Sequence, residues 1–377
     1  MRGSPVRPPL RVWVWIAATL ALVVVAALLW RGSDAAATES TTAAPADALP
    51  GAPAGAVFEA WSADGDPVPA DVVQEGRVLV GSDHGVRALD PLTGDEAWHY
   101  TRSNARLCGL TVTDGVAVAV FRTAERCDEA VALDAGTGVR AWTRNLDLRG
   151  DAALTSTASI VLASSPTGVL TLDPLGNNVR WRAGAPGGCT WLSAAAGSAG
   201  VAVLQRCAGG DVVQLRLYDG FTGSEHWTVD VPAAEDAELA LLGADALVGL
   251  RIDGEVRLHA PDGGALRTTL PVPGDDTVQQ TAAAGLVLVR VGGTASAIDP
   301  VWGVARWTAP ADGLPAAAPA DATEVVLPTA QGFVRRDART GGELGRSDAS
   351  AVPGGARAAV VGPVVVLRLD DGVRAYS

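Results

Sequence analysis

The chain has 377 residues, 48% of them hydrophobic, so it is long enough to bury a sizeable core in one large or two ordinary domains. Its formal net charge is −13, and all 29 basic residues are arginine. This balance argues against nucleic-acid binding, which needs clustered positive charge, and leaves solubility as the simplest interpretation. The bias toward alanine, glycine, valine and arginine is typical of a GC-rich genome, such as an actinobacterial one.

A first element is expected at residues 12–30, VWVWIAATLALVVVAALLW, which carry no charge. At about 1.5 Å per residue a helix of this length spans roughly 28 Å, close to the hydrocarbon core of a bilayer. The charged residues before it are Arg2, Arg7 and Arg11. The positive-inside rule therefore predicts a cytoplasmic tail at 1–11, a transmembrane signal anchor and an extracytoplasmic body.

A cleaved signal peptide is the alternative for this segment. Its apolar region is usually about 7–15 residues, shorter than the run here, although residues 34–37, DAAA, could supply a cleavage site. Residues 31–55 are low in complexity and nearly free of large apolar side chains, so they are predicted to form a disordered linker.

A motif, ALDPLTGDEAW at residues 88–98, recurs along the body. The other good copies are ALDAGTGVRAW at 132–142, TLDPLGNNVRW at 171–181, LYDGFTGSEHW at 217–227 and AIDPVWGVARW at 297–307. In each, aspartate precedes tryptophan by eight positions: Asp90 and Trp98, Asp134 and Trp142, Asp173 and Trp181, Asp219 and Trp227, Asp299 and Trp307. Glycine lies midway at Gly94, Gly138, Gly223 and Gly303, and Asn177 replaces it once. Both residue types tolerate a left-handed turn.

Two further copies are degraded. Residues 257–267, RLHAPDGGALR, place His259 at the aspartate position and Arg267 at the tryptophan position. Residues 335–345, RRDARTGGELG, keep Asp337 and Gly341 but have Gly345 where tryptophan is expected.

Each motif follows an apolar hairpin, such as RVLVGSDHGVRAL at 77–89. Four short strands per roughly 40 residues are typical of a β-propeller blade. The last unit, at 364–376, lacks the motif turn and the tryptophan strand, whereas 56–66 holds Trp61 with no hairpin before it. Joining the two completes a blade, so the sequence predicts an all-β, eight-bladed β-propeller over residues 56–377.

Four cysteines occur, Cys108, Cys127, Cys189 and Cys207. An even number in an exported domain favours disulfides, and the similar spacings make Cys108–Cys127 and Cys189–Cys207 the simplest of three connectivities. A zinc site is the alternative, but the sequence has no CxxC pair and no histidine close to either pair.

These motifs resemble the pyrroloquinoline quinone (PQQ) repeat family, whose tryptophan-docking pattern is A-x-D-x-x-T-G-x-x-x-W. The resemblance covers about residues 56–377 and implies a propeller in which each tryptophan packs between adjacent blades. The family contains quinoprotein dehydrogenases and non-enzymatic propellers such as the outer-membrane assembly lipoprotein. WD40 and kelch propellers fit less well, because their signatures do not recur at the blade period.

The resemblance implies, for an enzyme, bound calcium and PQQ with adjacent cysteines beside the cofactor. This chain has no adjacent cysteines and only four asparagines, and its blades are short. Its histidines, His84, His99, His226 and His259, lack metal-ligand spacing. The motif aspartates recur once per blade, so we expect each to bond its own turn rather than to act as a catalytic pair. No catalytic, cofactor-binding or metal residue is predicted.

The sequence therefore favours a membrane-anchored, non-catalytic propeller that binds another envelope protein or a cell-wall component. Two alternatives stay open, a PQQ- and calcium-dependent dehydrogenase and an extracytoplasmic ligand- or carbohydrate-binding propeller.

Overall fold

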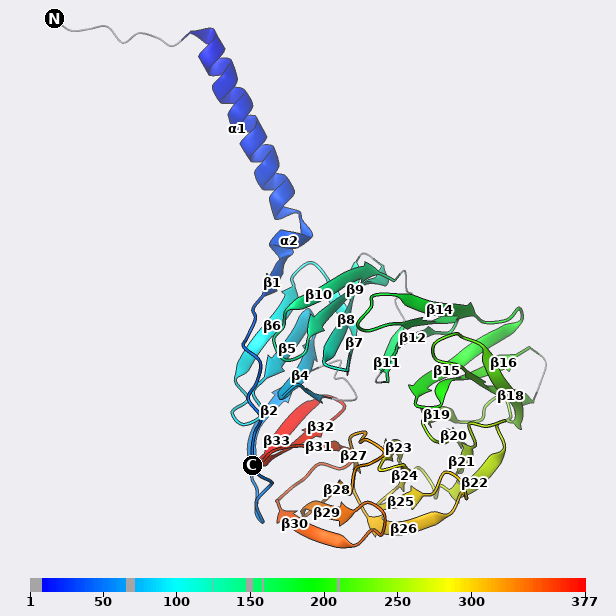
Figure 1. Cartoon of the computed structure of the whole chain (residues 1–377). Helices are drawn as coiled ribbons and strands as arrows, with labels where there is room; N and C mark the ends of the chain where they lie inside the picture. The colour runs from blue at the N-terminus through cyan, green and yellow to red at the C-terminus, as the bar shows by residue number, and fades with distance from the viewer. Residues whose placement is uncertain (1–8, 66–71, 124, 147–151, 158, 209–210) are drawn as a thin grey trace, which may run out of the picture.

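Eight small antiparallel sheets stand around one axis and close into a ring (Figure 1). This computed structural model describes residues 9–65, 72–123, 125–146, 152–157, 159–208 and 211–377. The arrangement confirms the eight-bladed β-propeller predicted from the sequence. We number the blades 1 to 8 in chain order.

Blades 1 to 4 each contribute four consecutive strands, innermost first. They are β3 (Val73–Gln74), β4 (Arg77–Ser82), β5 (Gly85–Leu89) and β6 (Glu96–Arg102); β7 (Arg106–Thr113), β8 (Val116–Thr123), β9 (Arg126–Asp134) and β10 (Arg140–Asn145); β11 (Ala153–Ser156), β12 (Val161–Ser165), β13 (Gly168–Leu172) and β14 (Val179–Gly184); β15 (Cys189–Gly197), β16 (Gly200–Cys207), β17 (Val212–Tyr218) and β18 (Glu225–Pro232).

Blades 5 and 6 repeat this pattern, whereas blades 7 and 8 depart from it. The strands are β19 (Leu239–Ala244), β20 (Val248–Ile252), β21 (Glu255–His259) and β22 (Leu266–Pro271); β23 (Val278–Ala283), β24 (Leu286–Val291), β25 (Thr294–Ile298) and β26 (Ala305–Pro310); β28 (Glu324–Thr329), β29 (Gly332–Asp337) and β30 (Glu343–Asp348) of blade 7; β31 (Arg357–Val361), β32 (Val364–Arg368) and β33 (Gly372–Tyr376) of blade 8.

The core lies between blades rather than inside them. Eight apolar clusters are present, and each combines buried side chains of two adjacent blades. The middle strands, such as β4, β8 and β32, are buried on both faces because valine, leucine and alanine pack against the neighbouring sheet on either side, whereas outer strands such as β6 alternate between buried and more exposed side chains. A blade can therefore bury its two faces only in the closed ring.

The ring closes as the sequence predicts. Strand β2 (Glu59–Asp64), from the start of the body, pairs antiparallel with β33 at its end, with Trp61 opposite Ala375. Blade 8 thus combines both ends of the body, and its sheet order is β2-β33-β32-β31-β27, where β27 (Leu314–Pro315) pairs in parallel with β31.

The segment after the apolar N-terminal helix differs from the expected disordered linker. Residues 34–37 form the short helix α2 (Asp34–Ala37), and β1 (Thr38–Ser40) pairs with the outer strand β6 of blade 1. Backbone groups, rather than large side chains, make these contacts: Thr41 N–H donates to His99 O at 2.9 Å and Ala43 N–H to Thr137 O at 2.9 Å. A prediction based only on low hydrophobicity therefore did not identify these ordered residues. We call residues 34–55 the strap.

The degraded copy in blade 5 is shifted by one residue from the expected register. In blade 1, the backbone N–H and O of Asp90 make the two hydrogen bonds that close the motif turn. In blade 5 the equivalent bonds involve Ala260, whose N–H donates to Ala265 O and whose O accepts from Gly264 N–H. Thr268 lies opposite Leu258, as Trp98 lies opposite Ala88. Ala260 and Thr268, rather than His259 and Arg267, thus occupy the aspartate and tryptophan positions. In blade 7, Gly345 lies at the tryptophan position, opposite Arg335, as expected.

One long apolar helix, α1 (Leu10–Arg31), precedes the ring and covers the predicted span. By length and composition it could cross a membrane, and a signal sequence near the N-terminus would pass the same test. It projects outward beside blades 1 and 2 (Figure 1).

Candidate functional site

The motif turns share one local geometry. The aspartate carboxylate accepts backbone hydrogen bonds from the two following turn residues, as when Asp219 Oδ1 accepts from Phe221 N–H at 3.0 Å and from Thr222 N–H at 2.7 Å. The residue four positions after the aspartate has a positive φ, including 75° at Gly94 and 54° at Asn177. These are turns that bond their own backbone, as expected for the motif aspartates.

Each motif tryptophan contacts the turn of the next blade. Its indole N–H donates to a backbone carbonyl there, in six pairs at 2.7–3.1 Å: Trp61 to Pro91, Trp98 to Ala135, Trp142 to Pro174, Trp181 to Gly220, Trp227 to Pro261 and Trp307 to Ala338. A Cβ at Gly94 would lie 2.7 Å from the Trp61 ring, so the turn glycine also makes room for the indole. The energetic role of these docking residues stays a prediction.

Both disulfides lie within single blades. Cys108 on β7 joins Cys127 on β9 in blade 2, and Cys189 and Cys207 face each other on β15 and β16 of blade 4. The local pairing predicted from the spacing is therefore the one present.

Two motif turns lack the usual threonine and have an arginine instead. In three turns the threonine hydroxyl donates to the aspartate, for example Thr137 to Asp134 at 2.7 Å. Where Trp302 replaces threonine, Arg306 donates to Asp299 Oδ2 at 2.9 Å. The Trp302 backbone N–H and the Arg306 guanidinium both hold the pKa of Asp299 below its ordinary value. The turn is therefore braced without a threonine, and position 302 is free to carry an indole.

That indole is exposed. Trp302 is 72% exposed, and Val301 and Val304 beside it are 64% and 54% exposed. The backbone of Arg267 on blade 5 lies within 3.0 Å of a Cβ placed at Gly303, and Leu266, its neighbour in the chain, is 52% exposed. We call Leu266, Val301, Trp302 and Val304 the aromatic patch. The tryptophan in AIDPVWGVARW signals it, although the sequence analysis used that copy only for its repeat.

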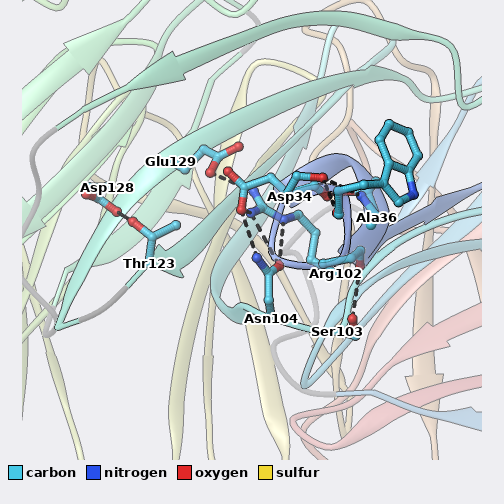
Figure 2. A network of polar contacts seen from close by, with 12 residues as sticks. Asp34, Ala36, Arg102, Ser103, Asn104, Thr123, Asp128 and Glu129 are labelled. Atoms are coloured by element: carbon cyan, nitrogen blue, oxygen red, sulfur yellow. Dashed lines mark hydrogen bonds and ion pairs between the residues drawn. The ribbon is translucent and has the colours of Figure 1, made fainter. Parts of the chain in front are cut away.

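A second polar cluster fixes the strap to blades 1 and 2 (Figure 2). The guanidinium of Arg102, 1% exposed, lies 2.9 Å from an Asp34 oxygen and 2.6 Å from a Glu129 oxygen. Asn104 Nδ2 donates to the same Asp34 oxygen at 2.8 Å. Burial lowers the pKa of Arg102, but the hydrogen bond and charge of Glu129 and the charge of Asp34 outweigh it and raise the pKa. We call this cluster the strap clamp.

The mouth of the central channel is hollow. A cavity of about 810 Å³ lies among turns of blades 2 to 6 and is also bordered by Gln74 of blade 1 and residues 317–320, with small and hydroxyl side chains such as Thr157, Ser198 and Ala283 in its wall. Half-buried Asp245 in this wall has a raised pKa because of burial, opposed by the Ser198 N–H and the Arg357 charge. The volume is in the range of small-molecule sites.

The histidines lie apart from one another in the ring. His84 bonds Ala105 O at 2.6 Å, His99 bonds Glu96 at 2.6 Å, and His226 lies at the motif turn of blade 4. His259 bonds Gly264 O at 2.9 Å, and burial lowers its pKa. Across the described ranges no group of three or more His, Cys, Asp or Glu side chains is placed to hold a metal ion.

Comparison with known proteins supports the repeat assignment. Residues 52–188 match the PQQ repeat family described as outer membrane protein assembly factor BamB. This match confirms the resemblance to the PQQ repeat family. No curated protein matches the chain.

Solved structures that this chain is similar to include proteins of different kinds. The computationally designed Ika8 protein has a TM-score of 0.54 and 17% identity, covering 85% of this chain and 98% of its own. The quinohemoprotein alcohol dehydrogenase ADHIIG from Pseudomonas putida HK5 has a TM-score of 0.51 and 16% identity, covering 85% of this chain and 76% of its own. BamB from Moraxella catarrhalis has a TM-score of 0.49 and 16% identity, covering 85% and 99%. Identities this low carry the fold and no activity.

Proposed function

We propose that this is a single-pass membrane protein whose extracytoplasmic propeller is a non-catalytic scaffold for another envelope protein or a cell-wall component. The observation that carries the proposal is the aromatic patch. A tryptophan exposed to 72% on a turn braced by Asp299 and Arg306 is costly to keep in water and is the residue type most enriched at binding hot spots.

The membrane assignment rests on the N-terminal segment. Arg2, Arg7 and Arg11 favour a cytoplasmic N-terminus, with residues 12–30 in the bilayer. The two disulfides fit an oxidising compartment on the other side.

A photocrosslinking amino acid at position 302 of the full-length membrane protein tests the patch. We expect an adduct that excess wild-type protein competes away and that excess Trp302→Ala protein does not. The same crosslinker at Asp275, exposed on a connecting segment, is the matched control. Equal adducts from both positions would contradict the proposal.

Two other functions make different predictions. A quinoprotein dehydrogenase would turn over alcohols or sugars with a dye acceptor once PQQ and Ca²⁺ are added, and measurable turnover would replace the scaffold proposal. The hollow channel mouth favours a small-ligand or carbohydrate binder as the second candidate. Its ligands should protect Asp245 and Ser198 from hydrogen exchange and leave the crosslinks at 302 unchanged.

A further inference from the structure

Blade 7 lacks the inner strand that completes blades 1 to 6. Its sheet contains only β28, β29 and β30, so β28 has a strand partner on one side only within the described part of the chain. The preceding segment has gone elsewhere: Leu314 N–H donates to Ala356 O and Ala316 N–H to Ala358 O in blade 8, and Ala318 N–H donates to Ala282 O in blade 6. The inner edge of β28 therefore has no paired strand and lies beside the junction with blade 8 in the described part of the chain.

The register shows which backbone groups lie on that edge. Thr329 pairs with Gly332 across a two-residue turn, so residues 325, 327 and 329 exchange hydrogen bonds with β29. Glu324, Val326 and Pro328 then point their backbone groups the other way. Pro328 O accordingly accepts a hydrogen bond from Asp312 N–H at 2.9 Å, and β27 packs beside this end of the edge, so the part that stays open lies at Glu324 and Val326.

A cavity of about 580 Å³ lies against this edge. Its wall includes Glu324–Val326 from β28, Phe333 and Arg335 from β29, Gly345–Ser347 from β30 and Ala358–Val360 from β31. Strap residues 51–53 and residues 315–318 of the segment before β28 also border it. The missing tryptophan contributes to the space, because Gly345 stands where an indole would be. The nearest atom to a Cβ there is Arg335 Nη2, at 3.4 Å.

The wall is mainly apolar and has two arginines at its border. Arg335 and Arg346 line the cavity, and each has a carboxylate partner, Glu324 and Glu343 respectively, at 3.2 Å. Arg335 and Glu324 lie 3.2 Å apart and are 43% and 45% exposed, so solvent weakens this pair and an acidic group could compete for the arginine.

We propose that the cleft between blades 7 and 8 binds an extended, mainly apolar peptide segment with an acidic side chain, which adds to β28 as the fourth strand of blade 7. Free strand edges recruit extended segments because the backbone supplies the hydrogen bonds and alternate side chains fill pockets. Residues 324–327 of β28, before the covered Pro328, span about 14 Å at roughly 3.4 Å per residue, enough for a short strand. This site is separate from the aromatic patch and does not depend on what binds there.

The test uses a fluorescent heptapeptide of alternating valine and threonine with one central glutamate, titrated into the full-length protein in detergent. We expect saturable binding and slower hydrogen exchange at the Val326 amide. Two control peptides have the same side chains. One carries N-methyl groups on the alternate amides that point to one edge of the extended peptide, and the other carries them on the amides that point to the opposite edge. One of the two should bind at least about tenfold more weakly, because only one edge can pair with β28.

Two variants localise the site. Gly345→Trp should fill the cavity and weaken peptide binding at least about tenfold. Val326→Pro should do the same by removing an edge N–H, at a position equivalent to Pro328, where the β29 ladder tolerates proline. Trp302→Ala should bind the peptide like the wild type, which separates this site from the proposed scaffold surface. No binding up to about 1 mM, or equal binding by wild type and folded Val326→Pro, would overturn the inference.

Discussion

Single residues explain how one motif tolerates several sequences. Threonine braces the turn aspartate in blades 2, 4 and 7, and arginine seven positions after the aspartate braces it in blades 3 and 6, through Arg180 and Arg306. Because either donor satisfies the carboxylate, the threonine position can change to Gly176 or Trp302. An exposed tryptophan thus enters the turn without leaving Asp299 short of partners.

The depressed pKa of Asp299 makes a pH prediction. A carboxyl whose folded pKa lies below its unfolded value of about 3.9 stabilises the fold above that pH and loses this contribution as pH falls through the folded pKa. Asp299→Asn should therefore lower the free energy of unfolding at pH 7 by about 1–2 kcal/mol and flatten its pH dependence below about pH 4. Urea unfolding from pH 3 to 7 measures both. Asp275→Asn, at an exposed position, should change neither.

Trp98 should contribute strongly to stability. It is fully buried, and its indole N–H donates to Ala135 O at 3.1 Å across the blade junction. Trp98→Ala should cost about 3–5 kcal/mol, and Trp98→Phe, which loses mainly the hydrogen bond, about 1–2 kcal/mol. Urea unfolding gives the values. Trp302→Ala, at an exposed position, should change the free energy of unfolding by no more than about 0.5 kcal/mol from the wild type. An equal loss of stability in Trp98→Ala and Trp302→Ala would refute the docking role of Trp98.

At the level of elements, the repeat could be predicted because its spacing is a local property. Eight residues from aspartate to tryptophan fix one turn and one bulged strand, so five good copies located most of the blades. The register predicted for blade 5 is wrong by one residue. The position of the bulge before Thr268 is set by pairing with β21, and the altered sequence no longer indicates that position. The lost inner strand of blade 7 depends on contacts of Leu314 and Ala318 with two other blades, and no local pattern records them.

The disulfides give a prediction at the same scale. Each closes a loop of 18 or 19 residues, which on the chain-entropy model stabilises the folded state by about 3 kcal/mol. The pair Cys108→Ser with Cys127→Ser should lose roughly that amount in urea unfolding. Intact mass should rise by about 4 Da on reduction of the wild type and by about 2 Da in the double variant. An unchanged wild-type mass would exclude the bridges in the protein as produced.

The whole molecule joins a closed ring to its apolar N-terminal helix through an ordered connection. Strand β2 closes blade 8 from the N-terminal side, and the strap before it lies against blade 1 instead of hanging free. The sequence predicted the closing strand because Trp61 completes a blade count, but it predicted no strap because Ser, Thr and Ala contacts through the backbone leave no hydrophobic pattern. Helix α1 leaves the ring beside blades 1 and 2, whereas β26, which follows the Trp302 turn, lies across the ring (Figure 1). With α1 in the bilayer, as proposed above, a docked strap would therefore hold the aromatic patch away from the membrane.

The strap clamp should determine whether that geometry persists. Asp34→Ala removes one of the two carboxylates of Arg102 and the acceptor of Asn104, so the strap should detach more often. Because the Asp34 side chain is 70% exposed, we expect a loss on the order of 1 kcal/mol, or roughly fivefold faster hydrogen exchange at the Thr41 amide. Glu39→Ala, at an exposed position of β1, is the control and should leave this exchange rate unchanged. If Thr41 exchanged at the same rate in the Asp34→Ala protein and the wild type, the backbone contacts of β1 alone would hold the strap, and the clamp would have no part in mounting the ring on its anchor.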